Sequence, residues 1–526
     1  MKAEGRWRTA EARSSRTQPQ RSSVECGVSN ASTPVTHRVL PPVTCYSSRA
    51  RRSSALALHC LLGAFLLLPG CARFHSQPLS PGENAERLES RSLTNADLKL
   101  FLEKNLHREL ASWPAETWDF DMLTLAAFYY QPSLEVARAQ WAVARGGETT
   151  AAQRPNPSLN VTPGYDTTTS IPSPWFPLAT LDIPIETAGK RRLRRAQAAH
   201  LSEAARLNIA TVAWQVRSNL RSSLLDFGAA GQRAALLEQQ VSLQEQGIKL
   251  LDQQVQAGAL ADSAAAPFRI ALVKTRLDLA DAQQLRTQAR ARVAEAIGVP
   301  ISALELAKLP SDPLKAPGSG AELASAEVQR AALQSRPDIL GGLAEYAAAQ
   351  SALQLEIAKQ YPDVHVGPGY QYDLGDNKWS LGITLDLPIL NQNQGPIAEA
   401  TARRREAAAR FNDLQARVLA EIGRAVQTLQ IVEKSAVGFH ALADEQAKRR
   451  DSTEAQFQAG AVERLDLLNA QTEFAAAELL QLEGQIKLKQ ALGALEDAVQ
   501  RPLFGSAAAA PSSDSELLQN QPTAAK

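Results

Sequence analysis

The clearest pattern in this chain is a strict alternation of apolar and polar residues over positions 379–389. The apolar positions share one face of an extended segment, and they are Trp379, Leu381, Ile383, Leu385, Leu387 and Ile389. Residues 363–373 alternate in the same way. A period of two over about ten residues predicts a β-strand with one apolar and one polar face. Both stretches are therefore predicted to be strands.

The pattern occurs twice along the chain. Residues 180–185 read Thr-Leu-Asp-Ile-Pro-Ile and return at 384–389, 204 positions later, as Thr-Leu-Asp-Leu-Pro-Ile. Other landmarks keep nearly the same offset, such as Pro-Gly-Tyr at 163–165 and 368–370 and Gln-Ala-Gly-Ala at 256–259 and 458–461. A period this long exceeds the roughly 20–50 residues of solenoid repeats. It indicates a duplicated structural unit.

Long stretches without proline follow the strands of each copy. Pro184 is followed by 82 residues without proline and Pro396 by 105, and Ala, Leu, Gln, Glu and Arg are prominent in both stretches. Val241, Ile248 and Val255 recur every seven positions, which favours coiled-coil packing. A helix over 188–257 would measure roughly 105 Å at about 1.5 Å per residue. Gly258 and Gly460, each followed by a renewed helical pattern, predict turns, and hence two long helical hairpins.

These patterns predict the organisation of the chain. Residues 118–310 form the first repeat and 311–502 the second, while 503–526 are expected to be a disordered tail. The predicted strands and hairpins are, in order, strands at about 156–166 and 176–186, a hairpin at about 188–298, strands at about 362–373 and 378–390, and a hairpin at about 396–499.

Four such strands raise the question of their unpaired edges. Known membrane barrels start at about eight strands, and lipid leaves an open strand edge without hydrogen-bond partners. If the strands span a membrane, several copies of the chain must therefore combine. Two copies would give eight strands and three would give twelve, and the larger barrel leaves an obvious open lumen. A soluble, half-buried hairpin has the same alternation and remains an alternative.

The amino terminus carries the features of a secretory signal sequence. Three basic residues at 49–52 precede the mostly apolar run 55–68, which is too short to span a bilayer comfortably. Leu-Pro-Gly-Cys at 68–71 resembles a bacterial lipobox, whose cysteine is lipidated, so Cys71 is the expected lipidation site. Residues 1–70 are then an extension with a signal peptide, and 71–117 a lipid-anchored segment. A plain signal peptide or a buried apolar segment is the alternative.

Composition and charge mainly exclude classes of function. The formal net charge is +1, and basic runs at 190–195 and 403–405 lack interleaved aromatic residues, so they predict solvated helix starts rather than nucleic-acid binding. All four cysteines lie within the first 71 residues, and the seven histidines are scattered. The sequence contains no phosphate loop, nucleophile elbow or metal-ligand cluster. It therefore predicts neither an enzyme nor a cofactor site.

Taken together, the motifs resemble the TolC family of outer-membrane efflux ducts over roughly residues 118–502. Besides the duplicated unit, the motifs are Arg-Pro-Asn-Pro-Ser-Leu at 154–159, Tyr-Pro-Asp-Val at 361–364, Leu-Pro-Ile-Leu-Asn-Gln-Asn-Gln-Gly at 387–395, and the turn at 460–468. The motif at 387–395 most resembles the branch that serves heavy-metal and related RND exporters.

This resemblance implies a mainly α fold with a small transmembrane β part. Three chains would form a twelve-stranded β-barrel in the outer membrane, with four strands per chain, and an α-barrel tunnel through the periplasm. The tunnel would dock to a periplasmic adaptor protein and an inner-membrane RND pump, which supplies the energy. The implied location is the outer membrane, with a lipid anchor and outer-membrane lipid around the barrel, and no catalytic residue or cofactor is implied.

Residues at the two hairpin tips are the site candidates that the resemblance implies. Those expected to contact the adaptor are Gly258, Ala259, Gly460, Ala461 and Val462, with simple turn chemistry as the alternative. Asp466 matches an acidic position that contributes, in some relatives, to a ring at the tunnel entrance. Three carboxylates around a narrow mouth would concentrate cations there. A solvated helix-face aspartate or a helix cap is the alternative for Asp466.

A rival interpretation is a structural coiled-coil lipoprotein, or a periplasmic adaptor, without a membrane barrel. An adaptor places one helical hairpin inside a small β-domain. This chain instead duplicates the hairpin and the strands together, which favours the duct.

Overall fold

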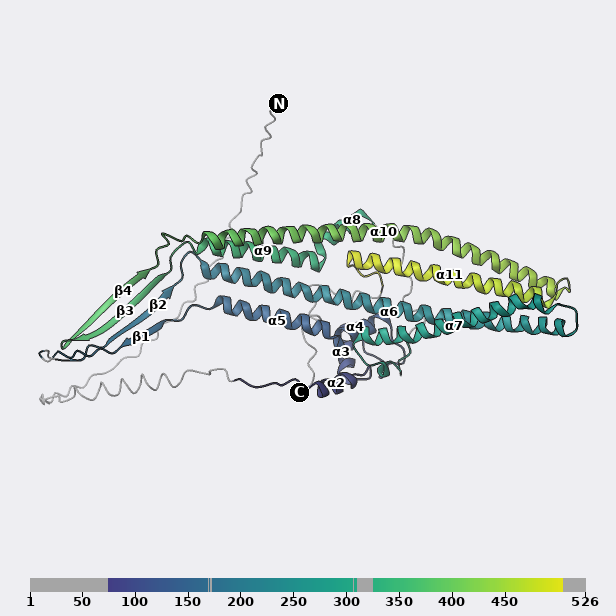
Figure 1. Cartoon of the computed structure of the whole chain (residues 1–526), viewed down its shortest axis with the longest axis horizontal. Coiled ribbons are helices and arrows are strands. Elements are labelled where there is room, and N and C mark those ends of the chain that lie inside the picture. Colours follow the sequence, from purple (N-terminus) through teal and green to yellow (C-terminus); the bar gives the residue numbers. More distant parts are fainter. Residues whose placement is uncertain (1–73, 169, 171–172, 306, 310–324, 505–526) are drawn as a thin grey trace, which may run out of the picture. The chain divides into compact units, whose positions relative to one another are not determined.

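The computed structural model describes residues 74–168, 170, 173–305, 307–309 and 325–504. The chain divides into one unit of residues 1–78 and a second of residues 79–526. In the first unit, the described residues 74–78 form neither helix nor strand. All of the elements below belong to the second unit, shown in Figure 1.

The second unit contains two similar series of helices and strands. The first comprises α2 (Pro81–Glu89), α3 (Ala96–Leu106), α4 (Phe120–Tyr130), α5 (Pro132–Ala152), β1 (Ser158–Thr162), β2 (Leu178–Ile185), α6 (Lys190–Gln256), α7 (Asp262–Ile297) and the 3-10 helix η1 (Ile301–Leu304). The second comprises α8 (Ala326–Ser335), α9 (Pro337–Ala358), β3 (Val364–Asp373), β4 (Asp376–Leu385), α10 (Gln394–Gln458) and α11 (Arg464–Val499).

The long helices lie side by side in one layer (Figure 1). Toward the sheet, the contacts run in the order α5, α6, α9 and α10. Away from the sheet, the order is α7, α6, α11 and α10. Helices α6 and α10 therefore extend along the whole layer, whereas α5 and α7 share one position in it and α9 and α11 share another. Each copy of the repeat supplies two adjacent positions.

The four strands form one antiparallel sheet in the order β1-β2-β3-β4. Leu159 of β1 lies opposite Leu181 of β2, and Val364 of β3 lies opposite Leu385 of β4. Val364 is 205 positions after Leu159 and Leu385 is 204 after Leu181, so the two hairpins have the same register. The repeat seen in the sequence is thus a repeat of strand pairing.

The largest hydrophobic core lies where α4 packs on α6. Leu123 and Leu125 of α4 and Leu220 and Leu224 of α6 are each 0% exposed. Leu98 and Leu102 of α3 join the same core, so the segment before α4 is fixed on the helical layer. Burial of this apolar surface is the main force holding the segment there.

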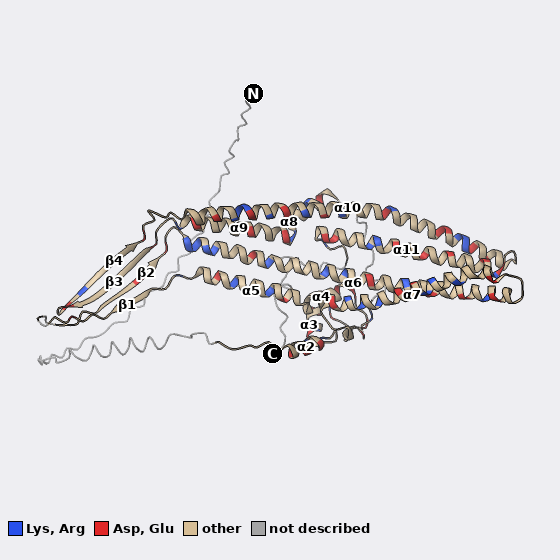
Figure 2. Cartoon of the chain, in the orientation of Figure 1, with Lys and Arg blue, Asp and Glu red and all other residues tan. Residues whose placement is uncertain are grey.

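The predicted mainly α fold with a small β part is confirmed by these elements. Within the described residues, none of the helices combines the length and the apolar character that crossing a bilayer requires. Figure 2 shows that charged residues of both signs are distributed along the helices, whereas the strands are mostly uncharged.

Candidate functional site

The sheet presents one apolar and one polar face, as its alternation predicted. Directly opposite residues share a face, so Leu159, Leu181 and Val364 fall on the same side as Trp379 and Leu381. This apolar side is open to the surroundings: Trp379 is 81% exposed and Leu381 is 69% exposed. An exposed apolar surface of this kind marks a contact with another protein or with a membrane.

Both edges of the sheet are open. Among the described strands, β1 pairs only with β2 and β4 pairs only with β3. The outer N–H and C=O groups of β1 and β4 are therefore available to a further strand. The helical layer ends in the same way, with α5 and α7 along one side and α10 along the other.

Each hairpin carries a cross-strand pair of aromatic rings on this apolar face. Tyr165 and Trp175 have ring centroids 4.9 Å apart, and Tyr370 and Trp379 also lie 4.9 Å apart. Tyrosine and tryptophan are enriched where a membrane meets water, because one end of each ring system is apolar and the other polar. Neither pair was predicted from the sequence, although the offset of 204 from Trp175 to Trp379 relates the two.

The junction between sheet and helices is held by half-buried polar contacts. The Lys190 ammonium at the start of α6 donates to Asp363 Oδ1 at 2.8 Å and to the Tyr361 carbonyl at 2.7 Å. Arg194 forms an ion pair with Glu186. The prediction that this basic run is simply solvated is wrong at Lys190, which is 7% exposed, because its charge is paired within the junction.

Both hairpin tips use the same turn. Gly258 and Gly460 have positive φ values of 73° and 72°, which favour glycine. The following N–H groups reach back five residues: Ala259 donates to Gln254 O at 2.9 Å, and Ala461 to Gln456 O at 2.8 Å. These bonds complete a Schellman motif, which ends a helix by satisfying its last carbonyls. The four tip residues Gly258, Ala259, Gly460 and Ala461 are exposed and Val462 is half-buried.

Asp466 lies in the first turn of α11 and is exposed. Its Oδ2 accepts a hydrogen bond from the Glu463 N–H at 3.0 Å, and the Glu463 side chain in turn bonds the backbone at Asp466. This reciprocal arrangement is a capping box, which satisfies the free N–H groups at a helix start. The structure therefore gives Asp466 the capping geometry that the sequence analysis left open.

A buried ionic cluster joins the two copies of the repeat. Arg217 of α6 forms an ion pair with Glu496 near the end of α11, and it also donates to the Phe504 carbonyl. Arg221 lies 3.3 Å from Glu496 and 2.5 Å from Asp497. Arg217 and Glu496 are both 0% exposed. This cluster was not predicted from the sequence, because its members are separated by about 280 residues and no local motif marks them.

Equivalent side chains close the two helix junctions. Gln131, before α5, donates to the Glu295 and Ala296 carbonyls at the end of α7 at 3.1 and 3.0 Å. Arg336, before α9, donates to the Ala498 carbonyl at the end of α11 at 2.6 Å. Both residues satisfy carbonyls that the helix itself leaves free.

The segment before α4 reinforces the first of these junctions. The Arg91 guanidinium donates to the Tyr130 and Gly298 carbonyls at 2.7 and 2.9 Å. The Tyr130 hydroxyl donates to the Ser92 carbonyl at 2.7 Å. Burial raises the pKa of Tyr130 to about 12, so this hydroxyl remains a donor at any physiological pH.

Two expectations concern metal and lipid. Cys71, the expected lipidation site, lies outside the described residues, as does the predicted tail from 505 onward. No group of three or more His, Cys, Asp or Glu side chains suited to a metal ion occurs in the described part of the chain. His365 contacts a single carboxylate, that of Asp182, at 3.0 Å on the polar face of the sheet.

Comparisons with known sequences match both copies of the repeat. The family described as outer membrane efflux protein matches residues 127–299 and 328–499. The cobalt-zinc-cadmium resistance protein CzcC of Cupriavidus metallidurans is 27% identical over 281 residues, which cover 51% of this chain and 62% of that protein. The pyoverdine export outer membrane protein OpmQ of Pseudomonas aeruginosa is 26% identical over 322 residues, covering 58% and 67%. The match to CzcC thus spans less than two thirds of that relative's length.

Solved structures share the fold. The outer membrane protein VceC from Vibrio cholerae has a TM-score of 0.60 and 18% identity, covering 74% of this chain and 99% of that chain. The outer-membrane channel OprN has a TM-score of 0.59 and 17% identity, covering 82% and 98%. At these identities the likeness is one of architecture.

Proposed function

Because the chain belongs to the outer membrane efflux protein family, we propose that it is the outer-membrane channel of a tripartite efflux system. Three copies form a passive duct that carries cargo from a periplasmic adaptor protein and an inner-membrane pump of the RND type across the periplasm and the outer membrane. The duct performs no chemistry, and the energy for transport comes from the pump.

The open edges of the sheet and of the helical layer carry this proposal. Each chain contains two copies of the repeat, and the second copy packs beside the first through α6 with α9 and α11. The free side of α10 is the equivalent of the α6 side that makes this contact. If another chain continues the same packing, α10 meets α5 and α7 of its neighbour, and β4 meets the neighbour's β1. Closure then leaves no free edge, which is what lipid requires.

The internal repeat also supplies the strand register between chains. Within the chain, Pro184 of β2 lies opposite His365 of β3. The equivalent of Pro184 in the second copy is Pro388, 204 positions later, and the equivalent of His365 in the first copy is Asn160, 205 positions earlier. Continuing the repeat therefore places Pro388 of one chain opposite Asn160 of its neighbour. Ile185 and Val364 map in the same way onto Ile389 and Leu159. This register places apolar residues opposite apolar residues, and it gives Ile389, which is 73% exposed in the single chain, an apolar neighbour.

The faces of the sheet support the proposed location. In the closed barrel the apolar face contacts lipid and the polar face lines water, as in other membrane barrels. The two Tyr–Trp pairs lie at the end of the hairpins away from the helices, where a membrane–water boundary is expected. Lipidation of Cys71 would add an anchor to the same membrane, with about 0.8 kcal/mol for each buried methylene of the acyl chains.

The hairpin tips are the proposed contact with the adaptor. The exposed tip residues are small, so a partner's backbone can approach them closely: they are Gly258, Ala259, Gly460 and Ala461, and Val462 adds an apolar contact. Asp466 follows in the first turn of α11, and three copies of it would place three carboxylates at the entrance.

A disulfide between neighbouring chains tests the proposed closure. Asn160→Cys and Pro388→Cys, combined in one chain, lie on β1 and beyond β4, at opposite edges of the sheet. Three strand spacings of about 4.8 Å separate these edges, too far for a bridge within one chain. We expect oxidation of membranes to yield linked dimers and trimers on a non-reducing gel, and no higher species.

Two controls fix the register of that bridge. Either cysteine alone should give no linked trimer, and Thr162→Cys with Pro388→Cys should react more slowly, because the two residues are then displaced by two positions along the strands. A ladder extending beyond three chains, or equal reaction of the displaced pair, would contradict the closed trimer and its register.

A further inference from the structure

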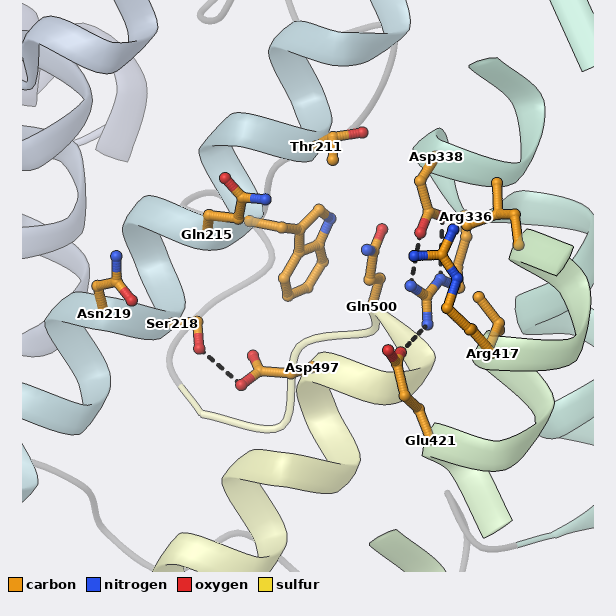
Figure 3. A pocket seen from close by; sticks show the side chains of 13 residues that line it. Thr211, Gln215, Ser218, Asn219, Arg336, Asp338, Arg417, Glu421, Asp497 and Gln500 are labelled. Atoms are coloured by element: carbon orange, nitrogen blue, oxygen red, sulfur yellow. Dashed lines mark hydrogen bonds and ion pairs between the residues drawn. The ribbon is translucent and has the colours of Figure 1, made fainter. Parts of the chain in front are cut away.

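A polar hollow interrupts the helical layer at the junction of α9 and α11. Its volume is about 500 Å³, and residues of α6, α10, the end of α11 and the start of α9 line it (Figure 3). This volume lies within the range of roughly 300–1,000 Å³ that is usual for sites binding small organic molecules. The ionic cluster around Arg217 lies beside the hollow, and it shares Asp497 with the lining.

The hollow lies on the face of the layer opposite α4. Val216, Leu220 and Leu224 of α6 are buried in the core that contains α4. Gln215 and Asn219, which line the hollow, are exposed and project from the other side of α6. At 3.6 residues per turn, Gln215 and Leu220 point about 140° apart. We place the face bearing α4 and the preceding segment on the outside of the proposed trimer, so the hollow opens into the lumen.

The floor of the hollow is fixed and its rim is open. Trp214 is 5% exposed, and Arg336 is held by Asp338 at 2.6 Å (Figure 3). On the rim, Gln215 and Asn219 offer amide groups from α6. Arg417 and Glu421 offer a guanidinium and a carboxylate from α10. The lining thus presents donors and acceptors together with both signs of charge.

The two rim charges are spaced for a ligand that carries both signs. Arg417 and Glu421 are four residues apart on α10, and such residues lie on one face of a helix with Cβ atoms about 5–6 Å apart. The Arg417 pair with Asp413, at 3.1 Å, is exposed on both sides, so it contributes little and can open for a ligand. Glu421 lies 3.6 Å from the fixed Arg336. A bare metal cation would meet these guanidinium groups, whereas a zwitterion complements them.

We propose that this hollow is a binding site for zwitterionic organic molecules, with the ammonium group beside Glu421 and the carboxylate beside Arg417. The amides of Gln215 and Asn219 bond the remaining polar groups, and Trp214 provides an apolar floor. Its role as a transit site for cargo rests on the proposed function, because only a closed tube makes this face a lumen.

A matched set of ligands tests the site on the purified full-length protein. Tryptophan carries both charges, tryptamine lacks the carboxylate, and indole-3-acetate lacks the ammonium group. We expect tryptophan to bind saturably in calorimetric titration. Each single-charge analogue should bind between about two- and fivefold more weakly, the range for loss of one exposed charge pair.

Two variants assign the charges to their partners. Arg417→Gln should reduce tryptophan binding to the level of tryptamine and leave tryptamine unchanged. Glu421→Gln should reduce tryptophan binding to the level of indole-3-acetate and leave indole-3-acetate unchanged. Arg405→Gln and Glu445→Gln are matched controls on exposed positions of α10, and they should bind like the parent.

The outcomes separate this site from the duct. Absence of saturable tryptophan binding, equal binding of all three ligands, or insensitivity to both variants would overturn the site. The hollow lies within one chain, so its binding can be measured whether or not the chains close into a tube. In planar bilayers, tryptophan should reduce the conductance of the parent and not of Arg417→Gln. Binding without any conductance would refute the duct and leave the site standing, whereas conductance that tryptophan does not affect would overturn its place in the lumen.

Discussion

Replacing Glu496 with glutamine tests what the buried ionic cluster contributes to stability. The Glu496 carboxylate is 0% exposed and lies between the Arg217 and Arg221 guanidiniums. Glutamine has nearly the same shape, so packing is kept while the negative charge is lost. Removing one partner of a buried ion pair leaves an uncompensated charge, which costs about 3–5 kcal/mol of the free energy of unfolding.

This cost converts into a measurable shift of melting temperature. Unfolding entropy is about 2.1 cal/mol/K per residue, which gives about 0.8 kcal/mol/K for a folded unit of roughly 400 residues. Glu496→Gln is therefore expected to lower the Tm by about 4–6 °C. The assay is thermal unfolding of the purified protein in detergent, followed by tryptophan fluorescence, since Trp214 lies directly over the Arg217 guanidinium.

Two comparisons isolate the charge effect. Glu445→Gln changes an exposed residue whose partner Lys448 is 3.4 Å away, and its expected effect is below about 1 °C. Arg217→Met with Glu496→Leu removes both charges of the pair, and it should recover much of the loss because no charge is left stranded. A Glu496→Gln protein that melts within 1 °C of the parent, or a double variant less stable than the single one, would refute this reasoning.

Three further outcomes follow from backbone geometry and capping. Gly298→Ala should lower the Tm by about 1–2 °C, because a side chain is strained in the left-handed conformation and its Cβ would lie 3.0 Å from the Tyr130 carbonyl oxygen. Gln500→Gly, at the equivalent left-handed position, should raise the Tm. Melting curves that show no difference between these two changes would rule out this account. Asp466→Asn should preserve the Tm because an amide oxygen still accepts the capping bond, whereas Asp466→Ala should cost about 1 kcal/mol of the free energy of unfolding. If Asp466→Asn leaves the reversal potential of the channel unchanged, Asp466 acts only as a helix cap and does not select cations. Tyr130→Phe removes the hydrogen bond to the Ser92 carbonyl, so it should speed proteolysis within residues 79–118. The effect should be seen at both pH 6 and pH 9, because the Tyr130 hydroxyl is a donor at both. Equal rates of proteolysis for parent and variant would count against a stabilising role for this hydrogen bond.

The sequence predicted the repeating parts of this fold well, because their causes are local. Period-two alternation identified four strands, and proline-free heptad stretches identified the long hairpins. The first strand is shorter than predicted, Ser158–Thr162 against about 156–166, because pairing with β2 is interrupted before the isolated bridge at Tyr165. The glycine turns were visible for the same reason, since a positive φ selects glycine within a few residues.

The parts that the sequence did not predict depend on distant contacts. The ionic cluster brings Arg217 next to Glu496, and the junction bonds bring Gln131 next to Glu295, across separations that carry no periodic signal. The helices before α4 were also missed, because at 9 and 11 residues α2 and α3 are too short to show a clear helical period. The hollow beside Gln500 arises where two helix ends approach, which no single stretch of sequence encodes.

The two copies of the repeat differ at their helix junctions. A side chain at Gly298 would collide with the Tyr130 carbonyl, whereas its counterpart Gln500 borders the hollow. In a trimer, the two kinds of junction would alternate around the wall. Fusion of two diverged copies thus lets a nearly six-fold backbone display a three-fold pattern of chemistry, which six identical half-length subunits could not do.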